Sequence, residues 1–290
     1  MVTVSLATWR ARMSEDMRLR DFRPRTQEAY LLATRQLLDW VKQEPEELTA
    51  EDVRYYVLYL REQRRLSPSS INVAVHALRF FFLHTLHRKW EVFELLRVNK
   101  PRRLPVVLSL AEVRQVLRTV QHPVRRMALT TIYALGLRLG EGLSLETGHI
   151  DSGRLLVWVR DGKGARDRGV PLPRPLLARL RQYWKTERPA SSSQHLFVPA
   201  SGSGLLHETT LQKTFVAARH EAGVDKHATI HTLRHSYATH LLENGVSLRT
   251  IQQLLGHGSL RTTEVYLHVT QPGTERVQET LDRLMADLYP

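Results

Sequence analysis

Residues 231–242 read HTLRHSYATHLL, and this stretch guides the interpretation of the whole chain. His231, Arg234 and His235 stand at positions i, i+3 and i+4, so a helix would place them on one face near its first turn. A helix start that carries His and Arg is a natural binding place for phosphate. A two-histidine metal site is the alternative, but Thr232 stands where a zinc protease has its glutamate, and no third ligand is clear.

The composition indicates a folded protein with a polyanionic partner. The 290 residues suggest about two domains, and 42 Lys and Arg against 29 Asp and Glu leave a formal net charge of +13. Both halves are basic, which favours a two-part clamp on nucleic acid over a basic arm beside an unrelated domain. The lack of cysteine excludes disulfide scaffolds, thiolate zinc sites, iron–sulfur clusters and cysteine catalysis. With no apolar run of membrane-spanning length and no recognisable signal peptide, a cytoplasmic, nucleoid-associated protein is expected.

Helical periodicity and its interruptions divide the chain into four parts. In the first part, Thr49 with Asp52 and Ser67 before Pro68 mark the starts of predicted helices. The parts are a helical domain at 1–97, a proline-containing basic linker at 98–107, a mixed domain at 108–272 and an amphipathic tail helix at 273–290.

The mixed domain is predicted to hold mostly helices and a small sheet. Residues 155–160 and 168–172 flank a glycine-rich turn and predict an antiparallel hairpin, and a further short strand is predicted at 196–198. Helical spacing recurs at 175–187, 209–222, 230–243, 247–255 and 262–269.

Two further motifs place single cations beside glycines. In GLRLGE at 136–141, Arg138 stands in an apolar stretch with Glu141 three residues later, and an unpaired buried guanidinium would be costly. An Arg138–Glu141 pair that only holds a helix together is the simpler interpretation of that motif alone. Lys163 lies between two glycines of DGKGARDR, where a mobile hairpin tip could present it to a ligand, although a solvated turn lysine has the same local sequence.

The last two candidate groups follow the helix predicted at 247–255. His257 lies between glycines in LLGHG, where the backbone can approach a ligand closely, and a helix C-cap with an incidental histidine is the alternative. Tyr266 follows nine residues later in TTEVYLHV, and taken alone it fits ordinary packing on an amphipathic helix.

Together these groups follow the order Arg, Lys, His-x-x-Arg, His, Tyr. The strings GLRLGE, GKGARDR, HTLRHSYATHLL and IQQLLGHGSLRTTEVYLHV, with the N-terminal SPSSIN region, resemble the tyrosine recombinase (lambda-integrase-like, phage integrase) family from about residue 5 to 285. Gly140 stands where a Ser is common, and Leu135 where a small hydroxyl residue is common. Neither departure removes a functional group, and both concern local helix geometry.

The resemblance implies a mainly α fold. The helical domain at 1–97 would be a SAM-like core-binding domain, and residues 108–272 would form a mostly helical catalytic domain with a small antiparallel sheet. Joined by the linker, the two would form a C-shaped clamp around duplex DNA.

The resemblance also implies a site-specific DNA recombinase that needs neither cofactor nor metal. Tyr266 would attack a phosphodiester, leaving a 3′-phosphotyrosyl link and a free 5′-hydroxyl, and strand exchange would pass through a Holliday junction without ATP. Arg138 and Arg234 would hold the non-bridging oxygens in place of a metal, and Lys163 would protonate the leaving 5′-oxygen.

The remaining residues would assist this chemistry. His231 would accept the tyrosine proton or donate to the phosphate, and His257 would hydrogen-bond the scissile phosphate. Glu141 would orient the cationic groups, and His235 would support the site or pack within its helix.

The partners implied are double-stranded recombination sites and three further copies of the chain in a synaptic tetramer. The tail would dock in trans on a neighbouring protomer or pack on its own domain, and the sequence leaves both open. A type IB topoisomerase-like enzyme and a DNA-binding protein of this fold that has lost catalysis are the alternatives, and a metal-dependent nuclease is disfavoured by its missing ligands.

Overall fold

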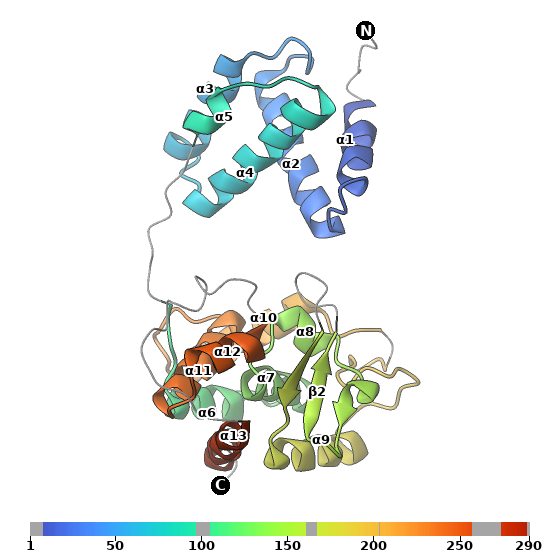
Figure 1. The fold of residues 1–290 in the computed structure, drawn as a ribbon, viewed down its shortest axis with the longest axis vertical. Helices are drawn as coiled ribbons and strands as arrows, with labels where there is room; N and C mark the ends of the chain where they lie inside the picture. Colours follow the sequence, from blue (N-terminus) through green and yellow to red (C-terminus); the bar gives the residue numbers. More distant parts are fainter. Residues whose placement is uncertain (1–7, 97–104, 161–166, 203, 257–273, 289–290) are drawn as a thin grey trace. The chain divides into compact units, whose positions relative to one another are not determined.

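The computed structural model describes residues 8–96, 105–160, 167–202, 204–256 and 274–288. The chain divides into two compact units, residues 1–103 and 104–290, and each is described by itself (Figure 1). The predicted mainly helical fold with a small antiparallel sheet is confirmed.

The described part of the N-terminal unit is helical, and its core draws on each long helix. Met13, Leu37, Val53, Leu78 and Phe82 are fully buried in one apolar cluster. In chain order the elements are α1 (Thr8–Arg18), α2 (Pro24–Val41), α3 (Ala50–Glu62), α4 (Pro68–Phe80), the π-helical turn η1 (Phe81–Thr85) and α5 (Val92–Leu95).

Two of these helices start where the sequence predicts. The backbone N–H of Asp52 donates to Thr49 Oγ1 over 3.3 Å, and the N–H of Thr49 donates to Asp52 Oδ2 over 2.8 Å, which completes a capping box for α3. Ser67 Oγ accepts from the N–H of Ser70, and Pro68 occupies the first turn of α4.

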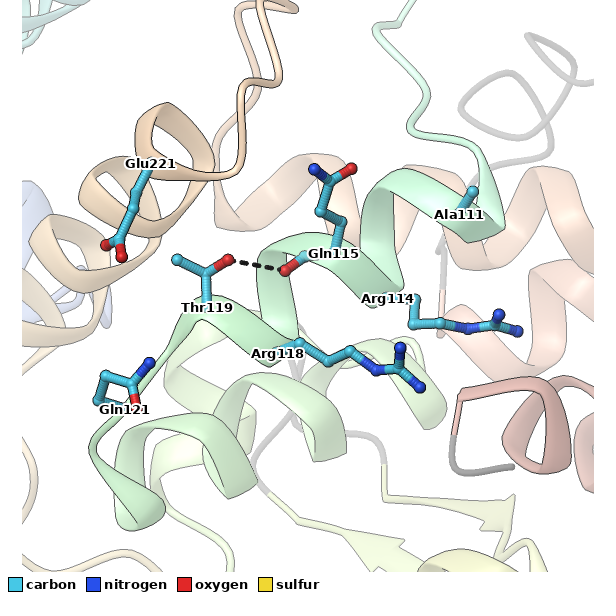
Figure 2. A pocket seen from close by; sticks show the side chains of 7 residues that line it. All are labelled: Ala111, Arg114, Gln115, Arg118, Thr119, Gln121 and Glu221. Atoms are coloured by element: carbon cyan, nitrogen blue, oxygen red, sulfur yellow. Dashed lines mark hydrogen bonds between the residues drawn. The ribbon is translucent and has the colours of Figure 1, made fainter.

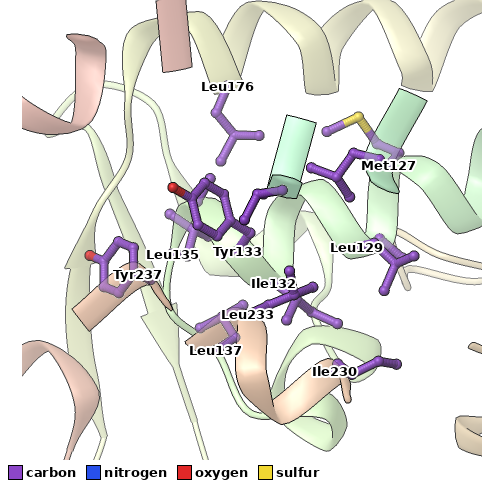
Figure 3. Packing of buried hydrophobic residues seen from close by; sticks show 14 of the residues in the cluster. Met127, Leu129, Ile132, Tyr133, Leu135, Leu137, Leu176, Ile230, Leu233 and Tyr237 are labelled. Carbon is purple, nitrogen blue, oxygen red and sulfur yellow. The ribbon is translucent and has the colours of Figure 1, made fainter. Parts of the chain in front are cut away.

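The C-terminal unit surrounds two central helices, α7 and α11, which pack against each other. Its helices and turns are α6 (Leu110–Thr119), α7 (Pro123–Ala134), α8 (Leu139–Leu143), the 3-10 turn η2 (Thr147–His149), α9 (Arg174–Thr186), α10 (Glu208–Glu221), α11 (Ile230–Glu243), α12 (Leu248–Leu255) and α13 (Thr274–Leu288). Figure 3 shows Ile132 and Tyr133 of α7 in one buried cluster with Leu233 and Tyr237 of α11. This packing fixes the position of α11, which carries the HTLRH motif.

The sheet has three antiparallel strands in the order β1 (Ile150–Asp151), β2 (Leu156–Val159) and β3 (Arg168–Pro171). The predicted hairpin is confirmed, with Val157 opposite Val170. The prediction of a strand at 196–198 is wrong: these residues are buried but form no ladder, and the neighbouring pairing is a single bridge between Glu146 and His195. Apolar burial alone therefore produced a strand-like pattern at that segment.

The tail helix α13 packs on its own unit. Its apolar face contacts α6, α9 and α11, and the buried side chains are Val277, Leu281, Leu284, Met285 and Leu288. Asp282 Oδ1 accepts from the backbone N–H of Arg174 at the start of α9 over 2.9 Å, and Gln278 Nε2 donates to the carbonyl of Leu172 over 3.2 Å. In the single chain the tail thus packs on its own domain, which is one of the two arrangements that the sequence left open.

A tight turn after α7 leads the chain toward α8. Gly136 has φ +59°, and a Cβ added there would overlap the ring of Tyr237. Only glycine combines that backbone conformation with such close contact to α11. The turn therefore determines the position of Arg138 relative to Arg234.

Gly136→Ala is expected to lower the free energy of unfolding of the C-terminal unit by about 2–4 kcal/mol, through backbone strain and overpacking against Tyr237. Urea denaturation followed by fluorescence measures this loss. Gly148→Ala is the matched control, because Gly148 is exposed and has no atom within 4 Å of an added Cβ. Equal effects of the two substitutions would contradict the packing argument.

Candidate active site

Arg138 lies at the start of α8 and is anchored by Glu141 one turn later. Its Nη1 donates to Glu141 Oε1 over 2.6 Å, and its backbone N–H donates to Glu141 Oε2 over 2.8 Å. The Arg138 side chain keeps 27% exposure, whereas that of Glu141 keeps 8%. The carboxylate therefore holds a guanidinium that still reaches solvent.

Arg234 projects from α11 into the same place and is almost fully buried. Its guanidinium donates to the carbonyls of Gly136 over 2.8 Å and Leu255 over 2.5 Å, and Nη1 lies 3.5 Å from Glu141 Oε2. It thereby joins the turn after α7, the end of α12 and the carboxylate of α8.

A third arginine, Arg168, completes the group and is not among the predicted site residues. It is the first residue of β3, and its Nη1 and Nη2 donate to the two oxygens of Glu141 over 3.1 and 2.8 Å. Arg138, Arg168 and Arg234 around Glu141 are hereafter the arginine cluster. Arg168 is the last residue of the string GKGARDR and the first residue of the strand predicted at 168–172. This position was the sequence signal that could have identified it as a site residue.

The electrostatics of Glu141 follow from these partners. Burial alone would raise its pKa, but the hydrogen bonds and charge of Arg168, followed by the bonds from Arg138, lower it to about 2. Glu141 is thus ionised at neutral pH, and three guanidiniums around one carboxylate leave a net positive charge.

His231 and His235 lie one turn apart at the start of α11, with ring centroids 4.7 Å apart in an edge-to-face arrangement. The pKa of His231 is lowered by partial desolvation and by the charges of Arg234 and Arg138. Desolvation, with His231 and Arg234 nearby, lowers the pKa of His235 to about 4. Both rings are therefore neutral at pH 7, and His231, the exposed one, faces the electric field of the arginine cluster.

The structure therefore brings together Arg138, Glu141, Arg234 and the two histidines of α11. The predicted residues Lys163, His257 and Tyr266 lie outside the described residues. Among the residues that are described, no group of three or more His, Cys, Asp or Glu could hold a metal ion.

A surface hollow elsewhere on the C-terminal unit does not coincide with this site. Figure 2 shows it beside α6, with Glu221 of α10 on its far side. The side chains that line it are Ala111, Arg114, Gln115, Arg118, Thr119, Gln121 and Glu221. No predicted site residue lines the hollow, so the chemistry of the described site rests on the arginine cluster and the α11 histidines.

Comparison with known proteins now adds to this geometry. Residues 107–272 match the Phage integrase family, and residues 9–92 match the Phage integrase N-terminal SAM-like domain. The chain belongs to the phage integrase family. The predicted tyrosine recombinase family is thereby confirmed, and so is the predicted enzyme class, a tyrosine-type site-specific DNA recombinase.

Its relatives cover most of the integrase. A putative integrase/recombinase of Sinorhizobium fredii, y4qK, is 41% identical over 261 residues, 90% of this chain and 84% of the relative. Tyrosine recombinase XerA of Thermococcus kodakarensis is 34% identical over 273 residues, 91% of this chain and 93% of the relative.

Solved structures agree with the fold. A crystal structure of XerA recombinase is 27% identical, with a TM-score of 0.51 over 95% of this chain and 97% of that one. A lambda integrase dimer bound to a COC′ core site shares the fold at 18% identity, with a TM-score of 0.72 over 93% and 99% of the two chains. In the described part of the integrase, no helix is long and apolar enough to cross a membrane.

The depressed pKa of Glu141 makes stability depend on acid pH. A carboxyl with an ordinary value of 4.5 and a folded value of about 2 stabilises the fold by about 3 kcal/mol above pH 4.5 and loses that contribution as the pH falls toward 2. Urea denaturation at several pH values should show that the difference in free energy of unfolding between wild type and Glu141→Gln decreases from pH 6 to about pH 3. The control Glu221→Gln, which replaces an exposed carboxyl, should have the same free energy of unfolding as wild type across this pH range. A stability difference for Glu141→Gln that does not change with pH would contradict the lowered pKa of Glu141.

Proposed function

We propose that this integrase exchanges strands between specific duplex DNA sites through a covalent 3′-phosphotyrosyl intermediate and a Holliday junction, without ATP or a metal ion. The observation that carries the proposal is the arginine cluster. Three guanidiniums share the single carboxylate of Glu141, so positive charge remains to stabilise a phosphate whose oxygens gain charge in the transition state.

Arg138 is the member of the cluster that contacts the phosphate most directly. Its side chain is 27% exposed, against 3% for that of Arg234. The hydrogen bonds from Glu141 fix the guanidinium, so little conformational entropy is lost when it binds a phosphate oxygen. Arg234 supports the same phosphate from within the fold.

In the cleavage step, the hydroxyl oxygen of Tyr266 forms a bond to phosphorus while the bond from phosphorus to the 5′-oxygen breaks. His231 accepts the tyrosine proton, and its lowered pKa supports this role because the ring is neutral at pH 7. Lys163 gives a proton to the leaving 5′-oxygen, and His257 donates a hydrogen bond to the phosphate. Attack by another strand's 5′-hydroxyl reverses these transfers, so the phosphoester energy is conserved and no ATP is consumed.

Glu141 and His235 support these groups. Glu141 orients the arginines and stays ionised throughout, as its lowered pKa requires. His235 packs edge-on against His231 and limits the rotation of that ring.

We further propose that the domain at 1–97, the linker at 98–107 and the catalytic domain at 108–272 clamp the duplex, and that four protomers join two sites. A lambda integrase tetramer bound to a Holliday junction has the same fold, which supports this assembly. The tail at 273–290 would then dock in trans on the face that α13 covers in the single chain. A cytoplasmic, nucleoid-associated location accompanies this function.

The nucleophile can be tested with a nicked suicide substrate in EDTA, on which cleavage traps the enzyme. Wild type is expected to form a covalent protein–DNA adduct, visible by denaturing electrophoresis, and Tyr266→Phe to form none, because it lacks the attacking oxygen. An adduct that persists in Tyr266→Phe, or that needs a divalent metal, contradicts the mechanism. Relaxation of supercoiled DNA without paired sites would favour the topoisomerase alternative. DNA binding by wild type without any adduct would favour the other alternative, a DNA-binding protein that has lost catalysis.

The role of Arg138 can be separated from DNA anchoring. Arg138→Ala is expected to slow adduct formation by about 100–1000-fold while duplex affinity changes little, since it removes a donor to the transition state. Arg181→Ala, on the exposed face of α9, is the matched control and should cleave like wild type. Arg234→Ala is less informative, because it also leaves the carbonyls of Gly136 and Leu255 without their donor. If Arg138→Ala instead loses binding in proportion to cleavage, Arg138 only anchors DNA.

A further inference from the structure

Arg168 uses its side chain entirely within the fold of the C-terminal unit. The side chain is 10% exposed. Its Nη1 and Nη2 form a bidentate fork on Glu141, and its Nε donates to the carbonyl of Leu254 over 2.8 Å. Three directional donors on one planar group are a property of arginine that lysine cannot reproduce.

The fork fixes the carboxylate that holds Arg138. Glu141 Oε1 accepts from Nη1 of both Arg168 and Arg138, and Oε2 accepts from Nη2 of Arg168 and the backbone N–H of Arg138. Because Arg168 binds both oxygens, it sets the plane of the carboxylate. The direction in which Arg138 points therefore depends on Arg168.

The third donor of Arg168 fixes the end of α12. The last carbonyls of a helix have no partner within the helix, and here Leu254 is bound by Arg168 and Leu255 by Arg234. Gly256 follows with φ +61°, and a Cβ there would lie 2.9 Å from Cδ of Arg168. Arg168 thus packs against the residue that precedes His257.

Arg168 also begins the strand that leaves the hairpin tip, five residues after Lys163 in the sequence. One side chain therefore connects β3, α8 and the end of α12. Each of these three elements carries or adjoins one of the proposed catalytic residues.

We infer that Arg168 is a positioning residue for strand cleavage, which couples the orientation of Arg138 to the placement of the α12 terminus and the base of the hairpin without itself contacting DNA. The inference rests on the proposed function, because cleavage is its readout. Without a shared partner, α8, β3 and the end of α12 could each shift independently and carry their catalytic groups out of position. Because the guanidinium of Arg168 joins all three elements, their positions depend on one another.

The first experiment compares Arg168→Lys and Arg168→Gln in single-turnover cleavage of the nicked suicide substrate at saturating DNA. Arg168→Gln is expected to slow cleavage by about 100-fold and Arg168→Lys by about 10-fold, with duplex Kd within about 3-fold of wild type, because misplacement affects the transition state more than binding. Arg188→Lys is the matched control. Arg188 also donates to backbone carbonyls, those of Ser193 and His195, but lies apart from the arginine cluster.

The second experiment asks whether Arg168 acts through Glu141. The double variant Glu141→Gln with Arg168→Gln should cleave no more slowly than the slower single variant, since residues that act as one unit are not additive. In Arg168→Gln the cleavage rate should also fall at a higher pH than in wild type, because burial without the fork raises the pKa of Glu141. Arg188→Lys should leave the pH profile unchanged.

The outcomes separate the inference from the proposed function. If wild type forms an adduct and both Arg168 variants cleave at the wild-type rate, the inference fails while the function stands. If the Arg168 variants lose cleavage, DNA affinity and thermal stability together, additively with Glu141→Gln and with an unchanged pH profile, Arg168 is only structural and the inference fails. If wild type forms no adduct, the proposed function fails and the inference fails with it.

Discussion

The site depends on one buried carboxylate. Glu141 would be costly to bury as an isolated anion, and it is tolerated because three arginines from three elements converge on it. The converse also holds, since those guanidiniums would repel one another without it. The arrangement holds positive charge at one place in the fold, as the proposed stabilisation of a phosphate in the transition state requires.

The framework behind the carboxylate explains why the cluster forms. The packing of α7 against α11 fixes Arg234, and the glycine turn at Gly136 brings α8 back toward α11. The first residue of β3, Arg168, then donates to both oxygens of Glu141. Local helix signals place each arginine on its element, but only the tertiary packing makes them neighbours.

Much of this could be predicted from sequence, and the failures have physical reasons. The caps at Thr49 and Ser67, the hairpin and the HTLRH helix rest on local patterns that hold in the structure. Arg168 was missed because its partners lie 27 and 86 residues away, and periodicity carries no information on such contacts. Strand β1 was missed because two residues show no alternation, and the segment at 196–198 was mistaken for a strand because burial without a pairing partner looks the same in sequence.

The apolar face of α13 has a consequence for assembly. Its five buried side chains are each worth about 1.5–3 kcal/mol of burial, so a tail that simply left its unit would expose a large apolar surface. If the tail docks in trans as proposed, the face that it leaves must be covered by the tail of another protomer, and every face is covered only when this series of exchanges returns to the first protomer. A closed ring of identical subunits meets this condition, whereas an open pair leaves one face bare and one helix unplaced. Under the proposed tail exchange, complete assemblies would therefore be more stable than partial ones.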